Sequence, residues 1–319
     1  MTADLGAARA ALEAYAATRL GGGTVGSIAV RAAGRIDEGY VSSGLALFDV
    51  TVRHTDGTSR TLQVVRKHTG VNEVLALRAL RRVPDGSGLP VLIADGRDAA
   101  GHWVLLPFYA GSKPPGRLAV PAGVFDVLAH VHARYERRCD ELDGVVTIDG
   151  PWWNDLCHRV ILPIIDQELT LRDRSDLRTA RVAVVEAATD PRFGRALERL
   201  PMTLIHGDMH DGNIIDGPDG IRVIDWGNAR VGPAMVDLAN IAGFDSAGLQ
   251  RYRAAWASTT GREIDPALVE LGYRFGTVVV STQYLGFAVR YGSSGEVLAM
   301  MAARRDALEA LGRLLDRGG

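Results

Sequence analysis

The chain has 319 residues, 47% hydrophobic and 23% charged, which is enough to bury the core of two domains or of one large two-lobed domain. Its formal net charge of −2 gives no reason to expect a nucleic acid or a membrane surface as partner, and the longest apolar stretch, 275–289, is too short to span a bilayer. The two cysteines, Cys139 and Cys157, form no disulfide framework, and the N-terminus does not resemble a signal peptide, so we expect a cytoplasmic protein, monomeric or homodimeric.

The first third of the chain predicts one helix followed by an antiparallel sheet. Residues 3–20 place apolar side chains on one helical face, and three glycines then stop the helix. A second helix is expected from Asn72, a good N-cap residue, to Arg82. Runs of β-branched and apolar residues between turn signals such as Asp56-Gly57 predict five strands, at 27–31, 45–52, 61–67, 89–94 and 102–107.

From Pro121 onwards the helical period dominates. Asp190-Pro191 and Asp265-Pro266 each combine an N-cap acid with a proline at the first helical position. Trp152 and Trp153 precede another helix, and their rings suit either a core or the stacking of a bound ring. The expected helices begin near Pro121, Asn154, Asp176, Pro191, Ser246, Pro266 and Glu296.

Residues 204–238 contain the polar residues whose spacing is most informative about function. Asp208 is followed five residues later by Asn213, and Pro218-Asp219-Gly220 is a strong turn signal between two short β-prone runs. The resulting hairpin returns Asp225 to the end at which Asn213 lies. Amide and carboxylate oxygens are ligands that a hard cation such as Mg²⁺ prefers, and Asp208 is placed to accept a proton from a hydroxyl.

This stretch resembles the catalytic core of the aminoglycoside phosphotransferase and choline kinase family, which is similar in fold to the protein kinases. His206-Gly207-Asp208, Asn213 and Asp225-Trp226-Gly227 match in order and spacing the kinase catalytic loop and its metal-binding aspartate. Gly207 and Trp226 stand where protein kinases have Arg and Phe, as is usual in the small-molecule branch. The resemblance implies a two-lobed α+β fold, with a five-stranded nucleotide-binding N-lobe at 1–106 and a helical C-lobe at 107–319.

By the same resemblance, the N-lobe binds ATP, with GTP as an alternative nucleotide. Lys67 would contact the α- and β-phosphates at the end of a strand, Glu73 would orient it, and Asp237 would brace the catalytic loop. Asp208 would be the catalytic base, and Asn213 and Asp225 would hold Mg²⁺. The remaining nucleotide-binding positions are Val65 against adenine, the backbone of Phe108 and Ala110 at the hinge, and Ser42 and Ser43 against phosphate.

The implied activity is transfer of the γ-phosphoryl group to a hydroxyl of a small molecule, first an aminoglycoside or another hydroxylated antibiotic, in resistance or self-protection. A sugar, nucleoside, choline or homoserine acceptor is the alternative within the family. Clustered carboxylates would suit an aminoglycoside, and the candidates are Asp140, Glu141, Asp143, Asp155, Asp166 and Glu168.

Two functions of another class stay open on the sequence. His206, Asp208, His210 and Asp211 alternate in a way that resembles the metal ligands of a metallohydrolase, and imidazole suits zinc. The second such function is that of a protein that binds a nucleotide without catalysing a reaction. The metallohydrolase alternative leaves Asn213 and Asp225 unexplained, and a protein without turnover would not need every core chemical position to be filled.

Overall fold

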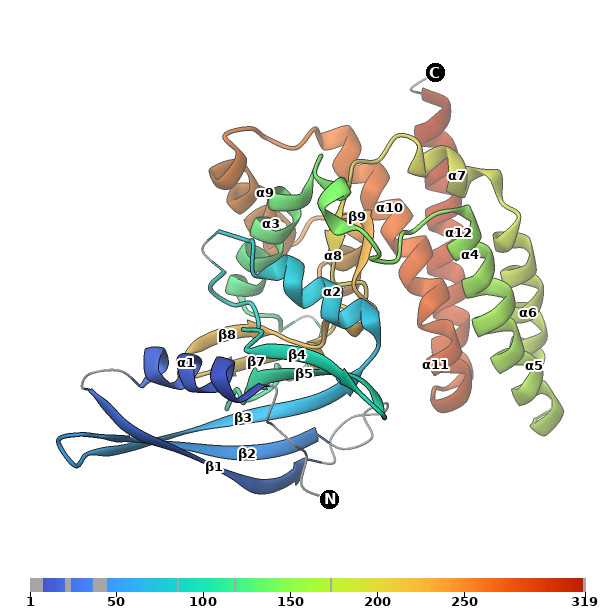
Figure 1. The fold of residues 1–319 in the computed structure, drawn as a ribbon. Helices are drawn as coiled ribbons and strands as arrows, with labels where there is room; N and C mark the ends of the chain where they lie inside the picture. The colour runs from blue at the N-terminus through green and yellow to red at the C-terminus, as the bar shows by residue number, and fades with distance from the viewer. Residues whose placement is uncertain are drawn as a thin grey trace. The chain divides into compact units, whose positions relative to one another are not determined.

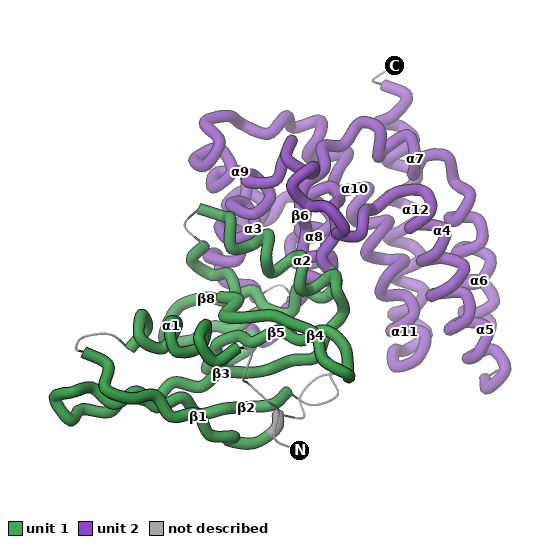
Figure 2. The backbone as a smooth tube through the Cα atoms, viewed as in Figure 1, with its two compact units in different colours: residues 1–113, 212–228 green, residues 114–211, 229–319 purple. Residues whose placement is uncertain are grey.

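In the computed structural model, the described residues are 8–20, 24–36, 45–84, 86–117, 119–172 and 174–317. They divide into two units by their internal contacts (Figure 2). Unit 1 consists of residues 1–113 and 212–228, and unit 2 of residues 114–211 and 229–319. The predicted division into an N-lobe at 1–106 and a C-lobe at 107–319 stays a prediction.

Unit 1 is built on one five-stranded antiparallel sheet with the strand order β1-β2-β3-β5-β4 (Figure 1). Helix α1 packs Leu12 and Ala16 on this sheet against a core that includes Phe48 and Trp103. The elements are α1 (Arg9–Arg19), β1 (Val25–Ile36), β2 (Leu45–His54), β3 (Ser59–Thr69), α2 (Val71–Leu80), β4 (Ala94–Asp98), β5 (Gly101–Pro107), β7 (Ile214–Gly217), β8 (Gly220–Val223) and η5 (Trp226–Asn228).

Two sequence-based boundaries in unit 1 are wrong. The strand predicted at 89–94 begins only at Ala94, because Leu89 and Leu92 are buried in an extended loop, while the paired strand is the polar run Ala94–Asp98. Helix α2 begins at Val71 with Gly70 as its N-cap, so Asn72 lies inside the helix. Its side-chain amide instead donates to the Gly227 carbonyl at 3.0 Å. The other predicted strands and the helix at 3–20 are confirmed within the described residues.

Unit 2 is mostly helical; its described part pairs β6 with β9, and Val231 of β9 also forms a parallel β-bridge with Thr147. A long apolar core joins α6, α10 and α12, and α10 lies along α12 in Figure 1. The predicted helix starts at Asp190, Ser246 and Asp265 are confirmed, and each of these side chains caps its helix by accepting a backbone N–H of the first turn. Among the described residues, none of the helices is long and apolar enough to cross a membrane.

The elements of unit 2 are α3 (Ala122–Tyr135), η2 (Cys139–Leu142), α4 (Gly150–Asp155), the π-helix η3 (Leu156–Ile161), α5 (Leu162–Leu171), α6 (Ser175–Ala188), α7 (Pro191–Leu197), β6 (Met202–Ile205), β9 (Arg230–Pro233), α8 (Met235–Ile241), α9 (Ala247–Thr260), α10 (Pro266–Gln283), α11 (Leu285–Tyr291) and α12 (Ser294–Arg317); the short turn η4 (Asp211–Asn213) leads from unit 2 into unit 1.

Within unit 1, the β7–β8 hairpin is joined to the segment after β5 by a close approach of two backbones. The Ser112 N–H donates to the Asp216 carbonyl at 2.9 Å, and the Asp216 N–H donates to the Ser112 carbonyl at 2.8 Å. A Cβ atom added to Gly217 would lie 2.1 Å from the Ala110 carbonyl oxygen. The glycine therefore lets the hairpin lie against the segment in which the nucleotide hinge is predicted.

We expect Gly217→Ala to lower the free energy of unfolding by about 1–3 kcal/mol, since backbone atoms cannot yield as a flexible side chain does. Urea titration followed by circular dichroism measures this. Gly116→Ala is the matched control, because a Cβ atom there meets nothing within 4 Å. Equal midpoints for the two variants would show that this contact does not hold the hairpin.

Candidate active site

Unit 1 brings three of the predicted charged residues together around the Lys67 ammonium. Lys67 Nζ donates to Glu73 Oε1 at 3.0 Å and to Asp225 Oδ1 at 2.7 Å. Glu73 is only 2% exposed, and it also accepts a short hydrogen bond from the Thr69 hydroxyl. The ion pair that the resemblance implied between Lys67 and Glu73 is thus present, although they are only six residues apart.

The two carboxylates keep Lys67 charged. Burial by itself lowers the pKa of Lys67, but the negative charges of Glu73 and Asp225 outweigh this and raise the pKa above its ordinary value. Lys67 therefore presents a fixed positive charge at the end of β3. Arg66 points to the other face of the strand, as the alternation of side chains predicts, and pairs there with Asp98.

The hairpin places Asn213 and Asp225 at one end, as predicted. Ile214 on β7 pairs with Val223 on β8, and just beyond this pair the Ile224 N–H donates to the Asn213 carbonyl at 2.9 Å. Asp225 has φ of +62°, which is uncommon for a residue with a side chain. Trp226, fully buried beside it, donates its indole N–H to the Val223 carbonyl at 2.9 Å. Asp225 is thereby turned out of the strand direction, and its side chain stays 53% exposed.

The other residues predicted to bind the nucleotide have the following surroundings. Val65 is buried on β3, in register with Leu106. The Phe108 N–H donates to the Gln63 carbonyl at 2.9 Å, so this hinge amide is already used by the sheet edge. Ser42 and Ser43 lie outside the described residues. The roles of these residues toward a nucleotide stay predictions.

In unit 2, a buried carboxylate accepts hydrogen bonds from the backbone of the loop that contains Asp208. Asp237 accepts the backbone N–H groups of His206 at 2.7 Å and Gly207 at 2.9 Å, which confirms its predicted bracing role. His132 Nε2 lies 3.3 Å from Asp237, and His132 Nδ1 lies 3.1 Å from the Tyr252 hydroxyl. Burial alone would raise the pKa of Asp237, but the hydrogen bond and charge of His132, together with His206, lower it below the ordinary range.

Three residues at this loop were not predicted from the sequence. Tyr284, at the junction of α10 and α11, donates its hydroxyl to Asp208 Oδ1 in a short hydrogen bond. Arg230 donates Nη1 to the Gly207 carbonyl at 3.1 Å and to Gln283 Oε1 at 2.8 Å. Gln283 in turn donates Nε2 to the same Gly207 carbonyl at 2.9 Å. The residue before Asp208 is therefore fixed by two side-chain donors.

Tyr284 acts on Asp208 as a neutral donor. Burial raises its pKa, and the negative charge of Asp208 raises the pKa further, so the phenol keeps its proton at any working pH. One oxygen of Asp208 is thus occupied by a hydrogen bond that fixes the plane of the carboxylate.

The structure gives no support to a transition-metal site at His206 and its neighbours. The His206 ring is fully buried, and its Nδ1 accepts the backbone N–H of Asp208 at 3.3 Å. The described residues contain no group of three or more His, Cys, Asp or Glu side chains arranged to hold a metal ion. The hard oxygen donors Asn213 and Asp225 instead fit Mg²⁺, which takes one or two protein oxygens and completes its shell with phosphate and water.

Comparison with known proteins identifies the family and the fold of this chain. The family model described as the phosphotransferase enzyme family matches residues 41–270, more than half of the chain. A search of curated proteins gave no match. The choline kinase from Cryptosporidium parvum Iowa II aligns with a TM-score of 0.55 at 12% identity, covering 91% of each chain. Similarity at this level concerns the fold, and it supports the kinase-like α+β architecture.

Two further solved structures align with lower scores. A GDP complex of aminoglycoside 2′-phosphotransferase IIIa has a TM-score of 0.49 at 14% identity, covering 94% of this chain and 98% of that one. The macrolide 2′-phosphotransferase from Brachybacterium faecium has a TM-score of 0.45 at 16% identity, covering 92% and 96%. The family match over residues 41–270 and the kinase-like fold together show that this chain belongs to the phosphotransferase enzyme family and is a phosphotransferase acting on a hydroxyl acceptor.

Proposed function

We propose that this chain transfers the γ-phosphoryl group of ATP, with GTP as an alternative nucleotide, to a hydroxyl of a small molecule. The observation that supports it most is the contact of one ammonium, Lys67, with both Glu73 and Asp225. A nucleotide kinase needs these elements in one place: a cation for the phosphates, an acid that orients it and a carboxylate for the metal.

The same residues supply positioning and charge neutralisation for the nucleotide. Lys67, still paired with the buried Glu73, would release Asp225 and contact the α- and β-phosphates. Asn213 and Asp225 would then hold Mg²⁺, which neutralises phosphate charge when bound. Catalysis of this kind depends on pre-placed charges, which stabilise the transition state without reorganising when the phosphoryl group moves.

Asp208 would act on the acceptor. Tyr284 orients this carboxylate through Oδ1, and we infer that the carboxylate accepts the hydrogen bond of the incoming hydroxyl and takes its proton. The family resemblance makes an aminoglycoside or another hydroxylated antibiotic the first candidate acceptor, and a sugar, nucleoside, choline or homoserine the alternative. These compounds differ most in the positive charge beside the reacting hydroxyl.

Lys67→Ala should lower kcat/KM for ATP by roughly 10–100-fold, the factor that corresponds to losing one charged hydrogen bond worth about 1.5–3 kcal/mol. Steady-state ADP release with varied ATP measures it. Lys113→Ala removes an exposed lysine of the same unit and should leave kcat/KM unchanged. Unchanged ATP use by a folded Lys67→Ala variant would contradict the nucleotide assignment in unit 1.

Asp225→Asn should raise the Mg²⁺ concentration needed for half-maximal ADP release by at least the ~10–100-fold that loss of an outer-shell partner costs at a metal site. The measurement is a magnesium titration at fixed ATP, after removal of metal with a chelator. Elemental analysis of the purified chain runs in parallel. Stoichiometric zinc that is lost in His206→Ala or His210→Ala would instead favour the metallohydrolase alternative.

Asp208→Asn should abolish most phosphoryl transfer while Mg-ATP binding survives. The amide is nearly isosteric with the carboxylate but cannot take a proton, and general-base catalysis contributes ~10²–10⁴-fold. A loose transition state places the loss toward the lower end. Calorimetric titration of ATP beside a steady-state assay separates binding from turnover, with exposed Asp306→Asn on α12 as control. Loss of ATP binding in step with activity would assign Asp208 a structural role.

A further inference from the structure

Met209, the residue that follows Asp208, is tied to helix α8 by a buried side chain. Asn240 donates Nδ2 to the Met209 carbonyl at 2.5 Å, and only 5% of Asn240 is exposed. The Met209 side chain is buried as well, with 1% exposed. The backbone is therefore anchored directly after Asp208, in addition to the hydrogen bonds that hold the two residues before it.

The amide of Asn240 is itself oriented by a cation. Arg117, which precedes α3 in the chain, donates Nη1 to Asn240 Oδ1 at 3.2 Å. A guanidinium has donors and no acceptor, whereas the Met209 carbonyl can only accept, so the two partners require opposite ends of the amide. Only one orientation of Asn240 satisfies both partners, with Oδ1 toward Arg117 and Nδ2 toward Met209.

Helix α8 contacts the loop on both sides of Asp208. Asp237 and Asn240 are three residues apart, a spacing that places both side chains on one side of a helix. Asp237 accepts the two backbone N–H groups that precede Asp208, and Asn240 donates to the carbonyl that follows it. Asp208 therefore lies between two stretches of backbone that are bonded to the same helix.

Helix α8 is fixed against α10 by close contacts at both of its ends. A Cβ atom added to Gly276 of α10 would lie 2.4 Å from the Met235 carbonyl oxygen, so the two helices approach closely where α8 begins. Where α8 ends, the Tyr273 hydroxyl of α10 donates to the Ala242 carbonyl at 2.7 Å. Asn240 therefore reaches the loop from a support that is itself held in place.

We propose that Asn240 is a positioning residue for phosphoryl transfer and that Arg117 sets the orientation of its amide. This inference rests on the proposed function, in which the acceptor oxygen bonds to the γ-phosphorus, the bond to the ADP oxygen breaks and the hydroxyl proton passes to Asp208. Asn240 acts through Met209 on the direction in which the Asp208 carboxylate is presented. The rate of such a step depends steeply on the placement of the catalytic group.

Turnover by Asn240→Ala tests the proposal. Kanamycin, erythromycin, adenosine, glucose, choline and homoserine are each assayed for ATP-dependent phosphorylation by mass spectrometry, and the compound with the highest kcat/KM is used for all variants. Asn240→Ala should lower kcat by roughly 10–100-fold, because a misplacement of about 1 Å can cost ~10²-fold. The KM for ATP, and the Kd of Mg-ATP measured by calorimetry, should stay unchanged.

Asn240→Asp shows which of the two hydrogen bonds matters. The carboxylate has nearly the same shape and still accepts from Arg117, but it has no proton to donate to the Met209 carbonyl. It should therefore lose at least as much kcat as Asn240→Ala. Arg117→Ala should cost less, because the bond to Met209 can persist, and Arg117→Lys should recover part of that loss. Wild-type kcat in a folded Asn240→Asp variant would overturn the proposal.

A double-mutant cycle with Asp208→Asn separates positioning from a general loss of structure. If Asn240 acts through Asp208, adding Asn240→Ala to Asp208→Asn costs no further turnover, because the group that is positioned is already gone. An equal loss in both backgrounds would assign Asn240 a purely structural role and would reject the proposal.

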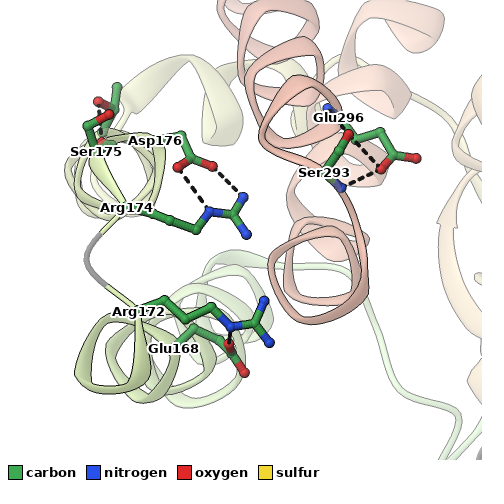
Figure 3. Close-up of polar contacts among 8 residues, drawn as sticks. Glu168, Arg172, Arg174, Ser175, Asp176, Ser293 and Glu296 are labelled. Carbon is green, nitrogen blue, oxygen red and sulfur yellow. Dashed lines mark hydrogen bonds and ion pairs between the residues drawn. The ribbon is translucent and has the colours of Figure 1, made fainter.

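Asp176→Ala is the matched control. Asp176 is buried to a similar degree, with 6% exposed, and Arg174 donates to it through two nitrogens at the start of α6 (Figure 3). Its removal should lower the midpoint of a urea titration while the kcat of the folded chain stays unchanged. A fall in kcat equal to that of Asn240→Ala would show that loss of any buried polar contact has this effect, and the proposal would fail.

Failure of the proposed function gives a different result. If none of the six compounds is phosphorylated, or if Asp208→Asn turns over as fast as the wild type, the proposed function fails and the inference fails with it. If Asp208→Asn loses phosphoryl transfer while Asn240→Ala retains the wild-type kcat, the proposed function stands and only the role of Asn240 is rejected.

Discussion

The buried carboxylate of Asp237 is the constraint on which the chemistry of unit 2 depends. A carboxylate that is 1% exposed is costly unless its oxygens are satisfied, and here they are satisfied by the two backbone N–H groups that precede Asp208 and by His132. The hydrogen bonds that offset the cost of burying this charge therefore also hold the loop rigid. Removing Asp237 would take this shared acceptor from both backbone N–H groups and from His132 in a region of low dielectric.

Side chains from β9, α10 and the junction of α10 with α11 also hold this loop. Gln283 and Arg230 share the Gly207 carbonyl, and Tyr284 holds one oxygen of Asp208. Gly207 has φ of +74°, a conformation that glycine adopts without steric cost, and this explains why a small residue stands where protein kinases have arginine. Arg230 from β9 lies against the loop instead and donates to the Gly207 carbonyl.

In unit 1 the signs of the charges are reversed, because a cation is held by carboxylates. One ammonium is surrounded by two carboxylates of unequal exposure, Glu73 at 2% and Asp225 at 53%. The buried partner, Glu73, keeps Lys67 in place, while the exposed partner, Asp225, is the metal ligand that we propose. A site of this kind is charged and oriented before a nucleotide arrives, so that little reorganisation is needed on binding.

The sequence by itself determined the fold class, through the family that its motifs resemble. It also determined the meeting of Asn213 with Asp225, because two short β-prone runs on either side of a strong turn signal form a hairpin. It also indicated the Lys67–Glu73 pair, which spans six residues. It could not reveal that Tyr284 touches Asp208, 76 positions earlier, because no local pattern relates a helix junction to a distant loop. It misplaced the strand at 94–98 and the role of Asn72, because partners from elsewhere in the fold decided both. Among the predicted acceptor carboxylates, Asp155 and Glu168 pair with arginines four residues further along the chain, a spacing that the sequence itself contains. The pairing of Asp166 with Arg181 was decided by tertiary structure, because it depends on which side chains the packed helices α5 and α6 bring within reach.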